Sequence, residues 1–147
     1  MLHSDSAPGE RELVELERDE CLSLLALEVV GRLATGAGDE APDVVPVNYA
    51  LHEGAPIFRT HDGTALERLR HGPVSFQVDR FDWFHHTGWS VLVQGVAEVI
   101  EPEELEGLEL ECWVPGRQTR FVRISPTRIT GRRIELHQDP TDAAGYL

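Results

Sequence analysis

The sequence of 147 residues contains no lysine, so all 13 of its basic residues are arginines. This absence excludes Schiff-base catalysis, the Walker-type phosphate loop and the lysine of the protein-kinase fold. The chain also lacks an apolar run of the roughly 18–20 residues that a membrane span needs. Its first residues do not show the basic-then-apolar layout of a signal peptide. We therefore expect a cytoplasmic protein with no membrane partner.

Cysteine is scarce as well. Cys21 and Cys112 stand alone, without the C-x-x-C spacing of a zinc or redox site. This argues against a disulfide framework, and we expect both residues to be small core side chains.

Acidic residues dominate the charge, which gives a formal net charge of -13. Such a chain repels nucleic acid unless a basic patch is segregated. The segment "GRQTRFVRISPTRITGRR" does hold arginines with no acidic residue among them, but no nucleic-acid recognition motif accompanies it. We therefore expect an exposed strand face whose arginines pair with the acidic surface, and no nucleic-acid partner.

The length and the hydrophobic content of 41% predict one folded domain. We expect a flexible N-terminus over residues 1–10, a domain over 11–136 and a C-terminal tail over 137–147. Leucines at helical spacing predict one or two short helices over 12–27, with Asp19 as a cap or break. Runs rich in β-branched residues predict six strands, over 29–35, 43–51, 56–60, 74–79, 89–100 and 119–134.

Hairpin turns are predicted at 36–39 and 53–54. The stretch "GTALERLRHG" predicts a short helix with a capping box formed by Thr64 and Glu67, and "EPEELEGLE" predicts an acidic helix or loop. The fold class is mainly β: a small, six-stranded, mostly antiparallel barrel with a few helices at its ends.

The stretch "FRTHDGT" combines groups that bind a phosphate. Arg59 offers a planar fork of donors, Thr60 and Thr64 offer hydroxyls, and a helix start offers backbone N–H groups. An alternative is that Arg59 pairs with Asp62 or Glu67 beside a capped helix. Spacing alone does not separate the two interpretations.

The stretch "DRFDWFHHTGW" gathers acidic, imidazole and aromatic side chains. The spacing of its Asp79, Asp82, His85 and His86 matches no known ligand pattern, so we predict no metal. We expect a polar loop with His85 or His86 near a substrate. The aromatic residues Trp83, Phe84 and Trp89, like Tyr49, could stack on a ligand or form dimer core.

The order of "VGRLAT", "VVPVNYAL", "IFRTHDGTALERLR", "VSFQVDRFD", "GWSVLVQGVAEVI" and "VRISPTRITGRRI" resembles the pyridoxamine 5'-phosphate oxidase-like FMN-binding split-barrel family, in its small actinobacterial and nitroimidazole-resistance-like branch. The resemblance covers residues 19–134. It implies a split β-barrel that forms a homodimer with FMN at the subunit interface.

The resemblance also implies where the cofactor binds. One strand would run beside the isoalloxazine ring with its backbone groups, and it comprises Val45, Pro46, Val47, Asn48 and Tyr49. Arg59 and Thr60 would meet the phosphate or the ribityl chain, and Gly63 and Thr64 would close the turn over the phosphate. Trp89 and Ser90 would reach the flavin, from the partner subunit in one version of this hypothesis.

Two departures from the family limit what carries over. Many relatives have a lysine where this chain has Ala65, so FMN binds more weakly here or Arg68, Arg70 or a C-terminal arginine replaces that cation. The ending "HQDPTDAAGYL" does not match the vitamin-binding segment of true pyridoxamine-phosphate oxidases, which argues against vitamin B6 oxidation.

The function that follows is a flavin-dependent oxidoreductase of a small molecule, with no catalytic residue assigned because no acid or base is placed for the reaction. NAD(P)H would bind only transiently, because no dinucleotide fingerprint is present. The alternatives are a flavin carrier or sensor without turnover, or a relative that binds deazaflavin or haem.

Overall fold

The computed structural model describes residues 10–70, 72–114, 116 and 120–137. Over these residues the chain forms an eight-stranded antiparallel sheet in the order β3-β2-β6-β7-β8-β5-β4, and β1 also pairs with β8. The strands are β1 (Arg11–Leu16), β2 (Val30–Ala37), β3 (Glu40–Asn48), β4 (Ala50–His52), β5 (Ala55–Thr60), β6 (Val74–Asp82), β7 (Thr87–Ile100) and β8 (Arg120–Leu136). The helices are α1 (Arg18–Leu25), α2 (Thr64–Leu69) and the 3-10 helix η1 (Pro102–Leu105).

The sheet curls into a half-barrel. Its two outermost strands, β3 and β4, are joined in the chain through the single residue Tyr49, so the ends of the strand order are brought back toward each other. This arrangement confirms the expected mainly β split-barrel class. The count of strands is higher than six because Tyr49 divides the run 43–51 into two strands and because β1 was not expected.

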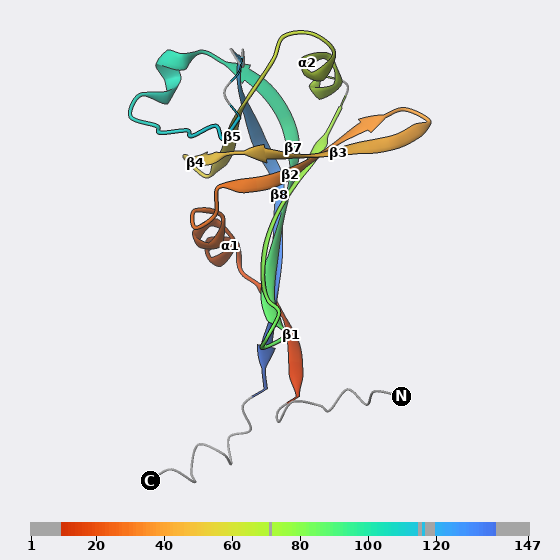
Figure 1. Ribbon diagram of the computed structural model, residues 1–147, viewed down its shortest axis with the longest axis vertical. Helices are drawn as coiled ribbons and strands as arrows, with labels where there is room; N and C mark the ends of the chain where they lie inside the picture. The colour runs from red at the N-terminus through yellow and green to blue at the C-terminus, as the bar shows by residue number, and fades with distance from the viewer. Residues whose placement is uncertain (1–9, 71, 115, 117–119, 138–147) are drawn as a thin grey trace.

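Figure 1 shows two regions, which we call the body and the stalk. The body holds β2 to β5, α2 and the adjoining parts of β6, β7 and β8. The stalk is the long extension of those last three strands, together with β1, and comprises residues 11–16, 79–90 and 128–136. The stalk exists because β7 and β8 run for 14 and 17 residues, well beyond the mean strand length of about 5–6.

The main core lies inside the curl. Phe58, Phe76 and Val93 are almost fully buried there, and α1 closes one side with Cys21 and Leu25. A side chain at Gly31 would begin 2.2 Å from the ring of Phe76, so only glycine lets β2 approach that ring. A second, smaller cluster is formed by Ile57, Ile100 and Leu105, with Leu108, Leu110 and Phe121 packed against it.

The predicted helix over 12–27 was wrong in its first half. Residues Arg11–Leu16 form strand β1, because they pair with β8 in a register that places Leu13 opposite Ile134. Leucines three residues apart do not separate a helix from a strand in so short a run, and the tertiary pairing decides. The break falls at Glu17, the N-cap of α1, and Asp19 lies within the first turn of that helix.

The capping box at Thr64 and Glu67 was also wrong. Gly63 is the N-cap of α2, and no side chain caps the helix there. The turns predicted at 36–39 and 53–54 are confirmed, since they join β2 to β3 and β4 to β5. The acidic segment forms η1, which does have a capping box between Glu101 and Glu104.

Cys21 is buried as predicted, and burial, aided by the charge of Glu20, raises the pKa of its thiol. Cys112 is only half-buried, so the core prediction was wrong for that residue.

Three arginines of the arginine-rich segment pair with acidic residues as expected. Arg120 lies 2.8 Å from Asp62, Arg123 lies 3.4 Å from Glu98 and Arg133 lies 3.6 Å from Glu20. Arg117 lies outside the described residues.

The division of the chain at residues 10 and 136 stays a prediction, because residues 1–9 and 138–147 lie outside the described part. Within that part, no helix has the length and apolar character needed to cross a membrane. The cytoplasmic location also stays a prediction.

Candidate functional site

A cavity of about 290 Å³ opens in the body between β2, β3, β5 and α2. Five of the predicted site residues line it: Val45, Val47, Arg59, Thr60 and Thr64. They come from three separate stretches of the chain, which the curl of the sheet brings to one place. The remaining lining residues are Leu33, Thr35, Asp43, Phe58, Ala65, Arg68 and Leu69.

One wall of the cavity is the edge strand β3. In the described part of the chain, β3 pairs with β2 on one side only, so its other edge presents backbone N–H and C=O groups without strand partners. Val44 and Val45 on this strand are 60% and 47% exposed. Pro46 suits an edge position because it has no N–H to donate. The strand can therefore offer backbone groups and apolar surface to a planar ligand.

Arg59 lies at the end of β5, on the border of the cavity. Its Nη2 donates a hydrogen bond to the carbonyl oxygen of Leu110 at 3.0 Å, and its guanidinium carbon lies 5.5 Å from the centre of the Phe121 ring. Its Nε is buried and finds no hydrogen-bond partner among the described residues. A buried donor without an acceptor is costly, so this nitrogen indicates a site where an acceptor belongs.

The alternative pairing of Arg59 was wrong. Asp62 pairs instead with Arg120 at 2.8 Å, and Glu67 pairs with Arg70 at 3.6 Å. Both acidic residues that could have neutralised Arg59 are therefore held by other arginines. Helix α2 has only six residues, so its dipole adds little and the arginines must carry the attraction for an anion.

A second cation stands in the cavity wall. Arg68 lines the cavity beside Ala65 and forms an ion pair with Asp43 across it. Arg70 borders a different hollow and contacts Glu67. Of the two helix arginines that could replace the missing lysine, the structure brings only Arg68 to the cavity. The sequence analysis did not identify Asp43 as a site residue. Asp43 begins a predicted strand, and nothing in the local sequence indicates that it pairs with Arg68.

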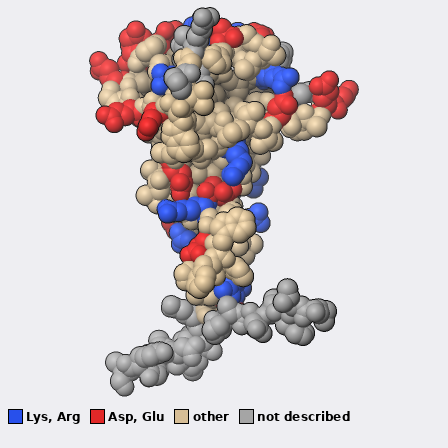
Figure 2. Space-filling model, in the orientation of Figure 1, with Lys and Arg blue, Asp and Glu red and all other residues tan. Residues whose placement is uncertain are grey.

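An acidic strap, residues 101–113, borders the site on the outside of β5. It holds six glutamates and no basic residue, and Figure 2 shows acidic side chains gathered over this part of the body. Two hydrogen bonds tie it to predicted site residues: Leu110 accepts from Arg59, and the backbone N–H of Trp113 donates to Oδ1 of Asn48 at 2.9 Å. The sequence predicted a helix or loop here but not these ties.

Asn48 and Tyr49 use their side chains within the protein. The amide of Asn48 also donates to the carbonyl of Val29 at 3.3 Å. The hydroxyl of Tyr49 donates to the carbonyl of Leu25 at 2.5 Å, and its ring meets Phe76 edge-on with the centroids 5.0 Å apart. Burial, with the nearby charge of Glu28, raises the pKa of Tyr49. The backbone N–H of Tyr49 donates to the carbonyl of Val29 at 3.0 Å, so neither side chain, nor this N–H group, is available to a ligand.

Gly63 adopts φ 111°, a left-handed conformation that favours glycine, and so sets the turn into α2. It does not line the cavity.

Trp89 and Ser90 lie in the stalk, apart from the cavity of their own chain. Trp89 borders an open groove of about 1100 Å³ on one side of the stalk, and Ser90 borders a groove of about 670 Å³. The turn with His85 and His86 lies at the far end of the stalk, so within one chain neither histidine is near the cavity. Among the described residues, no three His, Cys, Asp or Glu side chains are grouped so that they could hold a metal ion.

A curled antiparallel half-barrel with a cavity against its edge strand defines the split-barrel class. The sequence profile of the pyridoxamine 5'-phosphate oxidase family matches residues 17–133. The chain therefore belongs to the pyridoxamine 5'-phosphate oxidase family, which confirms the resemblance seen in the sequence.

Proteins that are similar in sequence and in structure agree with this family assignment. The uncharacterised protein Rv0080 of Mycobacterium tuberculosis is 36% identical over 139 residues, which cover 88% of this chain and 90% of that protein. The FAD-binding protein of Mycobacterium smegmatis is 34% identical with a TM-score of 0.72, covering 83% of this chain and all of that one. An FAD-binding protein of Mesorhizobium loti is 25% identical with a TM-score of 0.66, covering 86% and 99%.

A more distant structure shares the fold alone. The haem-binding protein of Mycobacterium smegmatis is 20% identical with a TM-score of 0.63, and the match covers 81% of this chain and 57% of that one.

Proposed function

We propose that this chain binds FMN in the cavity between β3, β5 and α2, and that it acts as a flavin-dependent oxidoreductase of a small molecule. The observation that carries the proposal is the cavity itself. It gathers Val45, Arg59 and Thr64 from three parts of the chain, beside a buried Arg59 Nε that has no acceptor. The FAD-binding relatives support a flavin nucleotide as the ligand class.

The residues present fit such a ligand. The exposed edge of β3 offers backbone groups and the apolar surface of Val45 and Val47 to a flat ring system. Arg59 and Arg68 would hold the phosphate, with hydroxyls of Thr60 and Thr64 as further donors. Arg68 would divide its charge between the phosphate and Asp43, which replaces the family lysine only in part.

The charge of the site favours one phosphate over two. Among the residues that the structure describes, two arginines line the cavity, and Asp43 already neutralises one of them. The acidic strap adds six negative charges on the neighbouring surface, which disfavours the second phosphate and the ribose of FAD. We therefore propose FMN rather than FAD. Haem is disfavoured, because none of the described residues that line the cavity is a His, Cys, Met or Tyr that could serve as an axial ligand.

When bound, FMN supplies two-electron oxidation and reduction, and the protein contributes binding and orientation. The described lining of the cavity offers no acid–base pair, since its one carboxylate, Asp43, is held by Arg68. A flavin carrier or sensor without turnover is the second candidate, and it is favoured by the same lack of an acid or base. Reoxidation kinetics after reduction with NAD(P)H separate the two.

We further propose that the active form is a homodimer. A cavity of about 290 Å³ lies just below the roughly 300–1,000 Å³ that ligand sites occupy. The predicted flavin contacts Trp89 and Ser90 lie in the stalk, so they can complete a site only from another chain.

Titration of FMN and riboflavin into wild type and Arg59→Ala tests the phosphate assignment. Loss of a charge-assisted, forked donor should weaken FMN by roughly thirty- to several-hundred-fold, or about 2–4 kcal/mol. Riboflavin has no phosphate, so its affinity should hardly change. An unchanged preference for FMN over riboflavin in Arg59→Ala would place the phosphate elsewhere.

Arg68 of α2 and Arg70, the C-cap of that helix, make a matched pair for the same titration. Arg68→Ala should weaken FMN by about tenfold, whereas Arg70→Ala should leave it unchanged, because only Arg68 lines the cavity. Equal effects of the two substitutions would mean that net charge, and not this cavity, governs binding.

A further inference from the structure

The acidic strap is fixed to the body at its start by apolar packing. Leu105, the last residue of η1, is buried beside Ile57 and Ile100. Leu108 and Leu110 follow it and pack, half-buried, against the same cluster. Figure 1 shows the strap leaving the end of β7 and returning beside β5. The first part of the strap therefore belongs to the smaller core cluster.

The end of the strap, residues 109–113, is held by fewer contacts. It contains no helix or strand, and none of its residues shares a backbone–backbone hydrogen bond with another described residue. Side chains of the body hold it instead. The carbonyl of Leu110 accepts from Nη2 of Arg59 at 3.0 Å, and the N–H of Trp113 donates to Oδ1 of Asn48 at 2.9 Å. Arg59 lines the cavity and Asn48 ends the edge strand β3, so the candidate site itself holds the end of the strap.

Charge works against the docked strap. None of its six glutamates forms an ion pair with a described residue, and like charges so close together repel one another. The chain as a whole has a net charge of -13, so its surroundings do not offset this repulsion. A segment with few bonds and unneutralised charge opens at a low cost in free energy. The bonds to Arg59 and Asn48 therefore decide how often the strap end is open.

The docked strap also fixes the orientation of Arg59. The guanidinium contacts both the strap, through Nη2, and the ring of Phe121, its register partner on β8. Its central carbon lies 5.5 Å from the centre of that ring, within the reach of a cation–π contact. Phe121 in turn packs against the cluster that anchors the strap. Because a guanidinium is a rigid plane, these contacts set the direction of its other N–H groups, including the buried Nε that has no acceptor among the described residues.

Resting on the proposed function, we propose that the strap positions Arg59 for the phosphate, and that phosphate binding and strap docking stabilise each other. The docked strap holds Arg59 in one orientation, which lowers the entropy cost of binding a phosphate. By linkage, a phosphate held by Arg59 stabilises the docked strap by the same factor. Leu110, through its carbonyl, and Phe121, through its ring, act through Arg59 and are positioning residues. A flavin without a phosphate leaves the strap unchanged.

The first test uses the protein without ligand. Amide hydrogen exchange at Trp113 measures opening of the strap end, because this N–H is held by Asn48 and not by Arg59. Arg59→Ala should raise the exchange rate at Trp113 about tenfold, since the strap loses a charge-assisted hydrogen bond. Arg70→Ala is the matched control and should leave the rate unchanged, because Arg70 pairs with Glu67. An exchange rate in Arg59→Ala equal to that of wild type overturns the proposal.

The second test adds ligand to wild type. Saturating FMN should slow exchange at Trp113 by about tenfold, whereas saturating riboflavin should not change it. Equal slowing by both ligands, or no slowing by bound FMN, overturns the proposal, because the strap would then not respond to the phosphate. If wild type binds no FMN, the proposed function fails, and inorganic phosphate replaces FMN as the probe. Slower exchange with inorganic phosphate then supports the coupling, and an unchanged rate overturns it.

The third test separates positioning from a structural role. Phe121→Leu keeps apolar bulk but removes the ring beside Arg59, so FMN should bind about fivefold more weakly and riboflavin as in wild type. Phe121→Tyr keeps the ring and should bind FMN like wild type. A loss of affinity in Phe121→Leu that is equal for FMN and riboflavin would overturn the assignment of Phe121 as a positioning residue.

Discussion

The body and the stalk share the strands β6, β7 and β8 but bury the side chains of these strands to different extents. In the body, the inward positions of β6, β7 and β8 are Phe76, Val93 and Ile129, which fill a closed core. In the stalk, the same face of these strands carries Arg80, Trp89 and Arg133. The body therefore holds most of the buried core, whereas the stalk buries Trp89 only in part and ends in a turn that leaves Trp83 and Phe84 exposed. This contrast is consistent with the homodimer that we propose.

The largest expected effect separates the two regions within one strand. Phe76 and Phe81 both belong to β6, but Phe76 is fully buried in the body and Phe81 is 47% exposed in the stalk. Phe76→Ala should lower the free energy of unfolding by about 3–5 kcal/mol, and Phe81→Ala by less than about 1 kcal/mol under conditions where the chain is monomeric. Urea unfolding measures both. Similar losses would mean that the stalk contributes to the core of the single chain.

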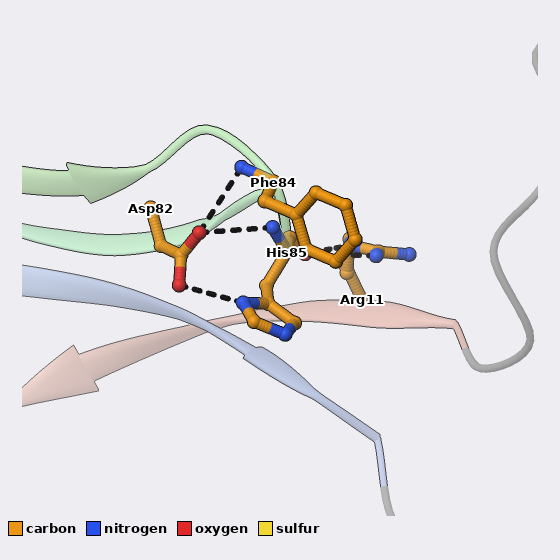
Figure 3. A network of polar contacts seen from close by, with 4 residues as sticks. All are labelled: Arg11, Asp82, Phe84 and His85. Carbon is orange, nitrogen blue, oxygen red and sulfur yellow. Dashed lines mark hydrogen bonds and ion pairs between the residues drawn. The ribbon is translucent and has the colours of Figure 1, made fainter.

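A smaller effect concerns the stability of the turn between β6 and β7 at acid pH. In this turn Oδ1 of Asp82 accepts hydrogen bonds from the backbone N–H groups of Phe84 and His85, each at 3.0 Å (Figure 3). The backbone and ring of His85, as hydrogen-bond donors, hold the pKa of Asp82 below its usual value. A lowered pKa in the folded state means that the carboxylate stabilises the turn above the unfolded value of about 3.9, and that this contribution is lost as the pH falls through the folded value. Between pH 5 and 8 the contribution of Asp82 to the stability of the turn should not change.

Amide exchange of Phe84 and His85 checks this prediction. Protection in wild type should fall only below about pH 4. Asp82→Asn keeps an oxygen acceptor for the two N–H groups but cannot be ionised, so its protection should be lower and almost independent of acid. A wild-type turn that loosens near pH 6 would contradict the assignment to Asp82.

Local signals in the sequence predicted much of the body. Each of these signals is made of residues that are neighbours in the chain, so pattern and turn chemistry identify it. The signals are the alternating β-branched residues, the turns at 36–39 and 53–54 and the stretch around Arg59. Family resemblance then brought Val45, Thr60 and Thr64 to one site, and the cavity contains all three.

Contacts between distant residues could not be predicted in the same way. Strand β1 forms only because residues 115 to 125 positions later extend past the body and pair with it. The pairing of Arg68 with Asp43 and the hydrogen bonds that tie the strap to Arg59 and Asn48 join residues from 25 to 65 positions apart. No local pattern encodes these distances, and the stalk position of Trp89 and Ser90 depends on the length of β7 in three dimensions.

The central claim is that the cavity of the body selects a flavin with one phosphate. The direct measurement is to equilibrate the purified protein with equimolar FMN, FAD, riboflavin, deazaflavin cofactor and haem, remove the free ligands, and identify what stays bound by mass spectrometry. The account predicts FMN at about one molecule per chain, since each chain contributes one cavity. Retention of FAD, deazaflavin or haem in place of FMN, or of no ligand at all, would contradict it.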